Sequence, residues 1–189
     1  MSLDVVKYRR AGSADYEGIL KLQAANYVVN LSEADRREGF LSAEFSREQV
    51  AVMAEDLGIM IAVEAKDIVG YLCAFRNDFN HGSPVLAAML NSYDRVKFEE
   101  NPLSSYNSYI YGPVCIAKNY RRQGLLRGLY EAHKRDLMGQ FDVGVAFVAS
   151  NNPHSLQAHI AGLGMVEVGD FEVKGNRYVI LAFRIPRRL

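Results

Sequence analysis

Apolar residues recur along this chain with two different spacings, and the spacings predict alternating strands and helices. Runs rich in β-branched and aromatic residues are typical of strands, and they cover residues 5–8, 59–65, 68–75, 109–117, 143–149, 165–173 and 177–185. Apolar positions three and four residues apart predict helices over residues 13–30, 46–58, 125–140 and 155–162. This order predicts a mixed α/β sheet with helices on its faces, in a single domain covering residues 1–189.

Local signals set the ends of several of these elements. Ser13 is expected to cap the first helix, and Ser46 with Gln49 fits a capping box, in which each side chain satisfies a free backbone amide. Gly58 can end the second helix in a left-handed conformation. Residues 78–106 are expected to be irregular, apart from a short helix that Ser83-Pro84 can start.

The predicted sheet combines antiparallel hairpins with one parallel pair of strands. Short turns at residues 66–67 and 174–176 join neighbouring strands, which are therefore expected to be antiparallel. The unit of strand, helix and strand over residues 109–149 is expected to have parallel strands and a right-handed crossover. Gly112 and Pro113 interrupt its first strand, and proline cannot donate to a ladder, so pairing should fail there.

The composition is that of an ordinary globular protein, and it mainly excludes some classes of binding partner. Of 189 residues, 49% are apolar and 23% are charged, and the formal net charge is zero. Nucleic-acid-binding proteins usually carry a basic excess, so a nucleic-acid partner is not expected. No apolar run approaches the roughly 20 residues that span a bilayer, and residues 1–4 do not begin a signal peptide. We therefore expect a cytoplasmic protein without a membrane partner.

Cysteine and histidine usage gives no metal signal. Cys73 and Cys115 lie in apolar runs and are expected to be reduced and buried. No cluster of side chains has the spacing of metal ligands, so no metal is expected. His81 and His154 are interpreted as loop residues, and residues 184–189 as a solvated basic tail.

The chemically informative segment covers residues 116–128 and joins a predicted strand to a predicted helix. Four basic side chains surround Gly124, whose lack of a side chain lets a ligand approach the backbone closely. The unpaired amides and the positive dipole end of a helix N-terminus attract phosphate. The segment predicts a phosphate or pyrophosphate site, with a solvated basic loop as the alternative. It matches neither a Walker loop nor a dinucleotide-binding fingerprint, because the required glycines are missing.

This segment resembles the signature of the GCN5-related N-acetyltransferase (GNAT) superfamily, R/Q-x-x-G-x-G/A between a strand and a helix. Arg121 and Gly124 match the arginine and the first glycine, whereas Leu126 replaces the second small residue. Residues 152–155 and 162–165 resemble the superfamily's N-x-x-A/S and L-G-F elements, with methionine in place of phenylalanine. The resemblance implies a mostly antiparallel mixed sheet with one splayed parallel pair and helices on both faces.

The resemblance also implies a binding site for acetyl-CoA as the co-substrate. In the superfamily the pyrophosphate rests on the amides of the signature loop, which here comprises Arg121, Arg122, Gln123, Gly124, Leu125, Leu126 and Arg127. The pantetheine arm pairs with the preceding strand, which here comprises Val114, Cys115 and Ile116. Asn152 and Ser155 match positions that touch the pantetheine or stabilise its turn, although Asn152 is equally well explained as a helix cap.

Acetyl transfer to an amine needs a neutral nucleophile, an oxyanion contact and a proton for the departing thiolate. The superfamily's proton donor is a tyrosine four residues after the A/S position, and counting from Ser155 gives His159. A histidine can donate a proton or position water, and its alternative role is packing on a helix face. The stretch from His159 to Leu163 is one residue longer than usual, so this helix is expected to end differently.

A general base is not marked in the sequence. Some superfamily members keep a carboxylate on the strand that here covers residues 109–117, but none occurs between Tyr106 and Ala117, and Tyr109 and Tyr111 occupy that strand instead. Water remains open as the base, as do three acids of the irregular segment, which otherwise are solvated surface charges: Asp78, Glu99 and Glu100.

The expected function is transfer of an acetyl group from acetyl-CoA to a primary amine. A small molecule or a peptide could carry that amine, and the sequence leaves this choice open, together with a homodimeric state. The alternative is a non-catalytic module that binds CoA and regulates a partner. The missing strand carboxylate and the missing helix tyrosine leave room for that alternative.

Overall fold

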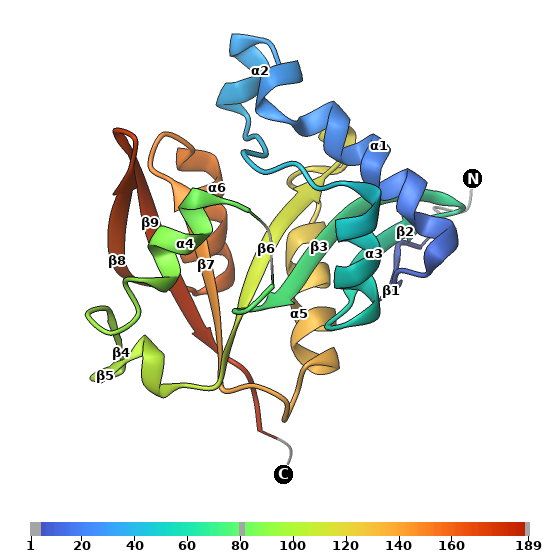
Figure 1. Ribbon diagram of the computed structural model, residues 1–189. Coiled ribbons are helices and arrows are strands. Elements are labelled where there is room, and N and C mark those ends of the chain that lie inside the picture. Colours follow the sequence, from blue (N-terminus) through green and yellow to red (C-terminus); the bar gives the residue numbers. More distant parts are fainter. Residues whose placement is uncertain (1–4, 80–81, 188–189) are drawn as a thin grey trace. The chain divides into compact units, whose positions relative to one another are not determined.

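The computed structural model describes residues 5–79 and 82–187 (Figure 1). The described residues group into two compact units. The first unit lies within residues 1–75 and 112–136, and the second lies within residues 76–111 and 137–189. A single domain over the whole chain therefore stays a prediction.

Antiparallel strands form most of the sheet in the first unit. β1 (Lys7–Arg10) pairs with β2 (Ile59–Glu64), and β2 pairs with β3 (Asp67–Arg76). Ala65 has a positive φ of 52° at the turn between β2 and β3. The predicted hairpin is confirmed, and its apolar run from Ile59 to Ala62 is fully buried.

The first unit also contains α1 (Tyr16–Asn26), α2 (Glu33–Arg37), α3 (Arg47–Glu55) and α5 (Leu125–Asp136). The predicted capping box of α3 is confirmed. Ser46 Oγ accepts from the Gln49 amide at 3.3 Å, and Gln49 Oε1 accepts from the Ser46 amide at 3.0 Å. Gly58 ends the helical segment with a φ of 94°, and its amide donates to the Met53 carbonyl at 2.9 Å.

Helices cover both faces of the strands in the first unit. A side chain added at Gly70 of β3 would meet Ile116 of β6 at 3.0 Å and Leu129 of α5 at 3.3 Å. Successive strand residues point to opposite faces, so Cys115 points away from α5. Its thiol lies 4.0 Å from the Leu22 carbonyl oxygen of α1.

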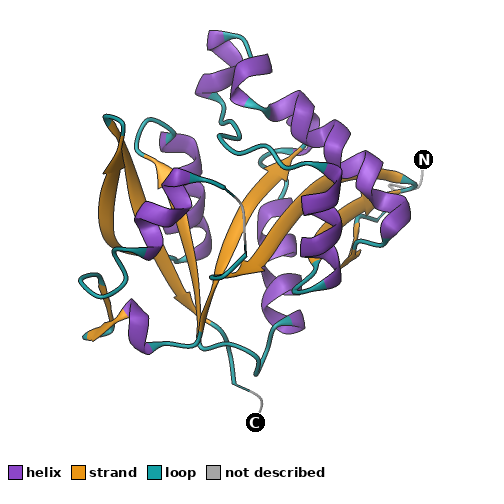
Figure 2. Cartoon of the chain, in the orientation of Figure 1, coloured by secondary structure: helices purple, strands orange, loops and turns teal. Residues whose placement is uncertain are grey.

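Strand β6 (Ser108–Ile116) contributes residues to both units. In the second unit it pairs in parallel with β7 (Val143–Ala149) over residues 108–110. β7 pairs antiparallel with β9 (Asn176–Arg184), and β9 pairs antiparallel with β8 (Val166–Val173). The seven-stranded sheet has the order β1-β2-β3-β6-β7-β9-β8. Figure 2 draws the strands in orange and the helices in purple. The expected fold class, a mixed and mostly antiparallel sheet with one parallel pair, is confirmed; the right-handed crossover stays a prediction.

The second unit has its own helices and a small hairpin. α4 (Pro84–Leu90) begins where expected, with Ser83 Oγ accepting from the Leu86 amide at 3.4 Å. β4 (Lys97–Phe98) and β5 (Asn101–Pro102) form a two-stranded hairpin in the segment that was expected to be irregular. α6 (Pro153–Gln157) continues directly into the π-helical turn η5 (Ala158–Gly162).

The π turn η5 and the β4–β5 hairpin lie on opposite faces of strand β9. Phe183 and Arg184 are neighbours in β9 and so point to opposite faces. The Phe183 ring packs edge-on against Tyr111, 5.4 Å between centroids, on the face that carries η5. On the other face the Arg184 guanidinium lies over the rings of Phe98 and Tyr106, 5.6 and 5.0 Å from their centroids.

Several predicted helix ends were wrong for local reasons. Ser13 does not cap α1, because residues 13–15 form a 3-10 turn (η1) and Asp15 Oδ2 accepts from the Gly12 amide at 2.8 Å. The first helix ends at Asn26 because Tyr27 is extended, and Val28–Asn30 forms a separate 3-10 turn (η2). The helix expected over residues 125–140 ends at Asp136.

Other corrections concern single residues and one missed helix. The first strand begins at Lys7 rather than Val5, and the sequence patterns had not indicated α2. Arg184 belongs to β9 and forms an ion pair with Glu99, so it is not part of a basic tail. His154 lies on α6 rather than in a loop. Residues 1–4, 188–189 and His81 lie outside the described residues.

Replacing Gly144 of β7 by alanine should destabilise the second unit. A Cβ there would lie 2.2 Å from Cζ of Phe183, whose ring is held between Tyr109 and Tyr111. Overpacking of this kind costs about 1–3 kcal/mol in the free energy of unfolding, which urea denaturation measures. Shortening Phe183 to leucine should relieve the overlap, so Gly144→Ala should cost clearly less in a Phe183→Leu background. An equal cost in both backgrounds would contradict this explanation.

Candidate functional site

The basic loop, residues 117–124 between β6 and α5, contains two residues with a left-handed backbone, Arg122 and Gly124. A 3-10 turn (η4, Lys118–Tyr120) follows β6, and Arg122 then takes a left-handed φ of 62°. Left-handed non-glycine residues are strained, and such strain clusters at binding sites. A turn of this kind can aim successive amides toward one point and form an anion-binding nest. Binding of an anion at this loop stays a prediction.

Gly124 is the residue at which the loop becomes helix α5. Its φ is 84°, and no described atom lies within 4 Å of the position that a Cβ would occupy. Its carbonyl accepts the first helical hydrogen bond from the Gly128 amide at 3.0 Å, so Gly124 is the N-cap. It has no side chain to cap the first-turn amides, which have no acceptor within the helix itself. A ligand oxygen could take that place.

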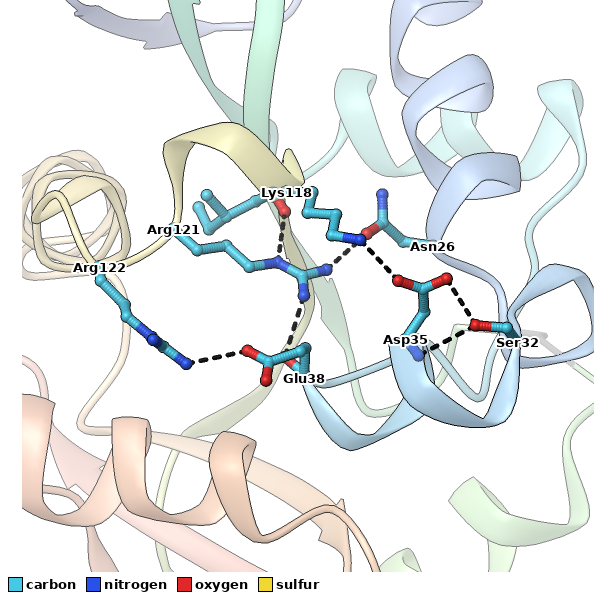
Figure 3. Close-up of polar contacts among 8 residues, drawn as sticks. Asn26, Ser32, Asp35, Glu38, Lys118, Arg121 and Arg122 are labelled. Atoms are coloured by element: carbon cyan, nitrogen blue, oxygen red, sulfur yellow. Dashed lines mark hydrogen bonds and ion pairs between the residues drawn. The ribbon is translucent and has the colours of Figure 1, made fainter.

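The Arg121 side chain turns back onto the protein instead of outward. Its guanidinium donates to the Ile116 carbonyl at 3.2 Å, to the Glu38 carbonyl at 3.0 Å and to Asn26 Oδ1 at 2.7 Å (Figure 3). Asn26 is buried at the end of α1, and Glu38 follows α2. The guanidinium therefore fixes the start of the loop against two other segments of the first unit.

Two further cations of the loop pair with acids next to it. Lys118 Nζ lies 2.6 Å from Asp35 Oδ1, and an Arg122 nitrogen lies 2.9 Å from Glu38 Oε2 (Figure 3). Hydrogen bonds from Lys118 and then from Ser32 lower the pKa of the Asp35 carboxyl. These pairs are largely exposed, and exposed pairs contribute only about 0–1 kcal/mol. A phosphate could therefore compete with the carboxylates at little cost.

The residues of β6 just before the loop are partly buried, and their one cysteine is not reactive. Val114 and Ile116 are half-buried, whereas Cys115 is buried, as expected. Burial raises the pKa of the Cys115 thiol to about 12, so it carries no thiolate at neutral pH. Cys73 is also buried and free. Neither cysteine is poised as a nucleophile, and contact of residues 114–116 with pantetheine stays a prediction.

In the second unit, Asn152 caps the helix that carries His159. Asn152 Oδ1 accepts from the Ser155 amide at 3.4 Å, and its carbonyl accepts from Leu156 at 3.1 Å. The capping alternative thus has a geometric basis, and contact of Asn152 or Ser155 with pantetheine stays a prediction. The expected irregular helix end is confirmed as η5, because a π turn accommodates one extra residue in a helix.

His159 lies at this π turn and is buried, with 4% of its surface exposed. Its Nδ1 lies 2.7 Å from the Ser155 carbonyl oxygen, and its Nε2 lies 3.4 Å from the Tyr111 hydroxyl. Burial lowers the pKa of the imidazole, and the bond to Ser155 opposes that effect only in part. His159 is therefore neutral at neutral pH, which suits a proton acceptor better than a direct proton donor.

The three acids considered as a general base differ in their surroundings. Glu99 is paired with Arg184, and this hydrogen bond lowers the pKa of the Glu99 carboxyl and makes it a weaker base. Asp78 and Glu100 are exposed. Across residues 5–79 and 82–187, no three or more His, Cys, Asp or Glu side chains group in a way that could hold a metal ion. No helix in the same residues has the length and apolarity to cross a membrane.

Two features of these sites were missed in the sequence. Ser32 caps α2 through the Asp35 amide at 3.1 Å, and the S-x-x-D spacing could have revealed this helix and its acids. The contact between Tyr111 and His159 joins residues 48 positions apart and left no local signal. The residues predicted to bind CoA or to act in catalysis fall into both units. Val114–Arg127 belong to the first unit, and Asn152, Ser155 and His159 belong to the second.

Comparison with known proteins finds solved structures that are similar to this chain over nearly its full length. No protein-family model and no curated protein sequence matches the chain. An N-acetyltransferase from Staphylococcus aureus is 12% identical, with a TM-score of 0.63 over 96% of this chain and 99% of the other. A protein of Desulfovibrio desulfuricans assigned to the GNAT family is 13% identical, with a TM-score of 0.62 over 96% and 99%. The yncA protein of Salmonella typhimurium, solved with acetyl-CoA, is 14% identical, with a TM-score of 0.61 over 98% and 96%.

These likenesses cover nearly the full length of both chains at low sequence identity. They show that the chain has the fold of the GNAT acetyltransferases. The resemblance read from the signature loop is therefore confirmed for the fold.

Replacing Arg121 by methionine should lower the free energy of unfolding by about 1–3 kcal/mol, because it leaves the buried Asn26 oxygen without this donor. Arg121→Lys should recover little, since one ammonium group cannot reproduce the planar fork that reaches three oxygens. The matched control is Arg122→Met, which removes one exposed pair and should cost about 0–1 kcal/mol. Equal losses for the two methionine variants in urea denaturation would contradict the structural role of Arg121.

Proposed function

We propose that this chain transfers an acetyl group from acetyl-CoA to a primary amine. The observation that carries the proposal is the open, left-handed turn at Gly124, immediately before α5 in a GNAT fold. Phosphate groups bind well at such a turn, because backbone amides and the positive helix end face the ligand. Acetyl-CoA carries a pyrophosphate and supplies the acyl group.

The residues of the basic loop fit a pyrophosphate through their backbone more than through their side chains. Arg121 is committed to protein oxygens, and the Gln123 amide group donates to the Asn119 carbonyl at 2.7 Å. The proposed contacts are therefore the amides of residues 122–127. Arg122 would add charge by exchanging its carboxylate partner Glu38 for phosphate.

The remaining predicted residues receive roles in the transfer step. Val114, Cys115 and Ile116 would pair with the pantetheine arm, and Asn152 and Ser155 would contact it. Pro113 has no N–H, so the first amide after the strand interruption is that of Val114, which would face the developing oxyanion. His159 would first accept a proton as a neutral imidazole and then give it up again for the departing thiolate.

The setting of the reaction is also a proposal. The acceptor is an amine on a small molecule or a peptide, and the protein acts in the cytoplasm. It needs no metal, nucleic acid or membrane, and it functions as a monomer or a homodimer.

The decisive experiment measures release of free CoA thiol from acetyl-CoA in the presence of a panel of amines. Transfer to at least one amine above the rate of hydrolysis supports the proposal. CoA binding by calorimetry without transfer to any amine would favour the alternative, a CoA-binding regulatory module. Tighter binding of ATP or NAD than of CoA would contradict both.

Replacing Gly124 by valine should weaken CoA binding more than about tenfold, which corresponds to 1.4 kcal/mol. The β-branched side chain would enter the open space at the turn and would not tolerate a φ of 84°. Calorimetric titration with CoA measures the affinity, and circular dichroism checks that the fold survives.

A matched control separates strain from blocking of the ligand. Gly175, in the β8–β9 turn, has a φ of 78° and also has no described atom within 4 Å of a Cβ. Gly175→Val should therefore carry a similar backbone strain while CoA affinity stays at the wild-type value. Comparable losses of affinity in both variants would show that strain alone, and not the loop, is responsible.

A further inference from the structure

Tyr111 and His159 form a buried pair in the second unit. Tyr111 lies on β6, His159 lies at the π turn η5, and each has 4% of its surface exposed. Their rings are T-shaped with centroids 5.7 Å apart, and the Phe183 ring also packs edge-on against Tyr111, 5.4 Å between centroids. The packing restricts both side chains to this orientation.

The contact to Ser155 fixes which imidazole nitrogen carries the proton. A carbonyl oxygen can only accept, so Nδ1 of His159 must donate to Ser155 across 2.7 Å. In the neutral ring Nε2 is then a bare acceptor, and it faces the Tyr111 hydroxyl at 3.4 Å. The hydrogen bond therefore runs from the tyrosine to the histidine. At 3.4 Å the contact is longer than the roughly 2.6–3.2 Å of a working proton-transfer contact, so the two groups must approach each other during the reaction.

The proposed oxyanion contact, the Val114 amide, follows Tyr111 by three residues on β6, so Tyr111 is the member of the pair assigned to the reacting carbonyl of the proposed function. Tyr111 directly precedes Gly112 and Pro113, and Val114 carries the first N–H after Pro113. No Asp or Glu occurs between Tyr106 and Ala117, so this strand offers no carboxylate base. A hydroxyl backed by a bare imidazole nitrogen can replace one, because the imidazole can take the hydroxyl proton.

We propose that Tyr111 and His159 form a proton relay for the transfer, an inference that rests on the proposed function. As the amine nitrogen bonds to the thioester carbon, its proton passes to the Tyr111 oxygen and the Tyr111 proton passes to His159 Nε2. When the carbon–sulfur bond breaks, the Nε2 proton returns to Tyr111 and the Tyr111 proton goes to the sulfur. The amine proton thus ends on the CoA thiol, with no other reactant.

In this relay Tyr111 is the catalytic residue that touches the reacting atoms. His159 holds the proton between the two steps and acts through Tyr111. Burial keeps His159 neutral before the reaction, which the first step requires. Of the described contacts of His159, Tyr111 from β6 is titratable and Ser155 from α6 is not.

The test compares Tyr111→Phe, His159→Gln and the double variant in the thiol-release assay with an amine that the wild type accepts. Each single change should lower kcat by about 10²–10⁴-fold, with the affinity for CoA unchanged. The double variant should be no slower than the slower single variant, because the two residues act as one unit. Glutamine can still accept the tyrosine hydrogen bond but cannot take up a proton, so it separates the relay from packing.

Two further measurements exclude a purely structural role. The wild-type kcat should fall as the pH drops through the lowered pKa of His159, and this fall should be absent in His159→Gln. The matched control is Tyr109→Phe, which removes a buried hydroxyl two residues earlier on the same strand and should leave kcat near the wild-type value. Thermal melting shows that each variant is folded.

Wild-type kcat in Tyr111→Phe, or losses that multiply in the double variant, would overturn the relay and leave the acyltransferase proposal standing. A wild-type protein that transfers to no amine of the panel would overturn both proposals. The CoA titration separates the two cases, because it measures CoA binding without the transfer step.

Discussion

Strand β6 contributes residues to both units, and the interruption at Gly112 and Pro113 marks where it passes from one unit to the other. Pro113 has no N–H to donate to a ladder, and the described pairing with β7 covers only residues 108–110. Residues before the interruption, including Tyr111, belong to the second unit, and residues after it lead into the basic loop of the first. Strand β6 thus carries a buried tyrosine and an interruption, and it leads directly into the loop that ends at the left-handed Gly124.

The basic side chains Lys118, Arg121 and Arg122 of the loop already bind oxygens of the protein itself. The Arg121 guanidinium occupies oxygens of three segments of the chain, whereas Arg122 and Lys118 form single exposed pairs with acids near α2. Buried or multiple hydrogen bonds are costly to lose, and exposed ion pairs are nearly neutral. The number of basic residues in the loop is therefore a poor guide to binding. In the proposed function, the loop amides contribute more contacts to the phosphates than the arginine side chains do.

Many elements could be predicted because their signals are local. The capping box of Ser46 and Gln49, the left-handed Gly58 and the start of α4 at Ser83-Pro84 each depend on a few adjacent residues. β7 is found at its predicted residues because its apolar run has the length of a buried strand. Prediction failed at Ser13, where the Asp15 carboxylate binds the Gly12 amide, since several polar side chains could have satisfied that amide.

The resemblance to the GNAT superfamily supplied the candidate position of His159, and the sequence by itself determined the order of the longer strands and helices and the glycine turn before α5. Local spacing carries that information, because backbone dihedrals and caps depend on neighbouring residues. Only the tertiary structure decided that Arg121 faces Asn26 and Glu38, and that the bare nitrogen of His159 faces Tyr111. These contacts join residues 48 to 95 positions apart. Burial and hydrogen-bond direction, which set proton affinity, arise only when such distant segments pack together.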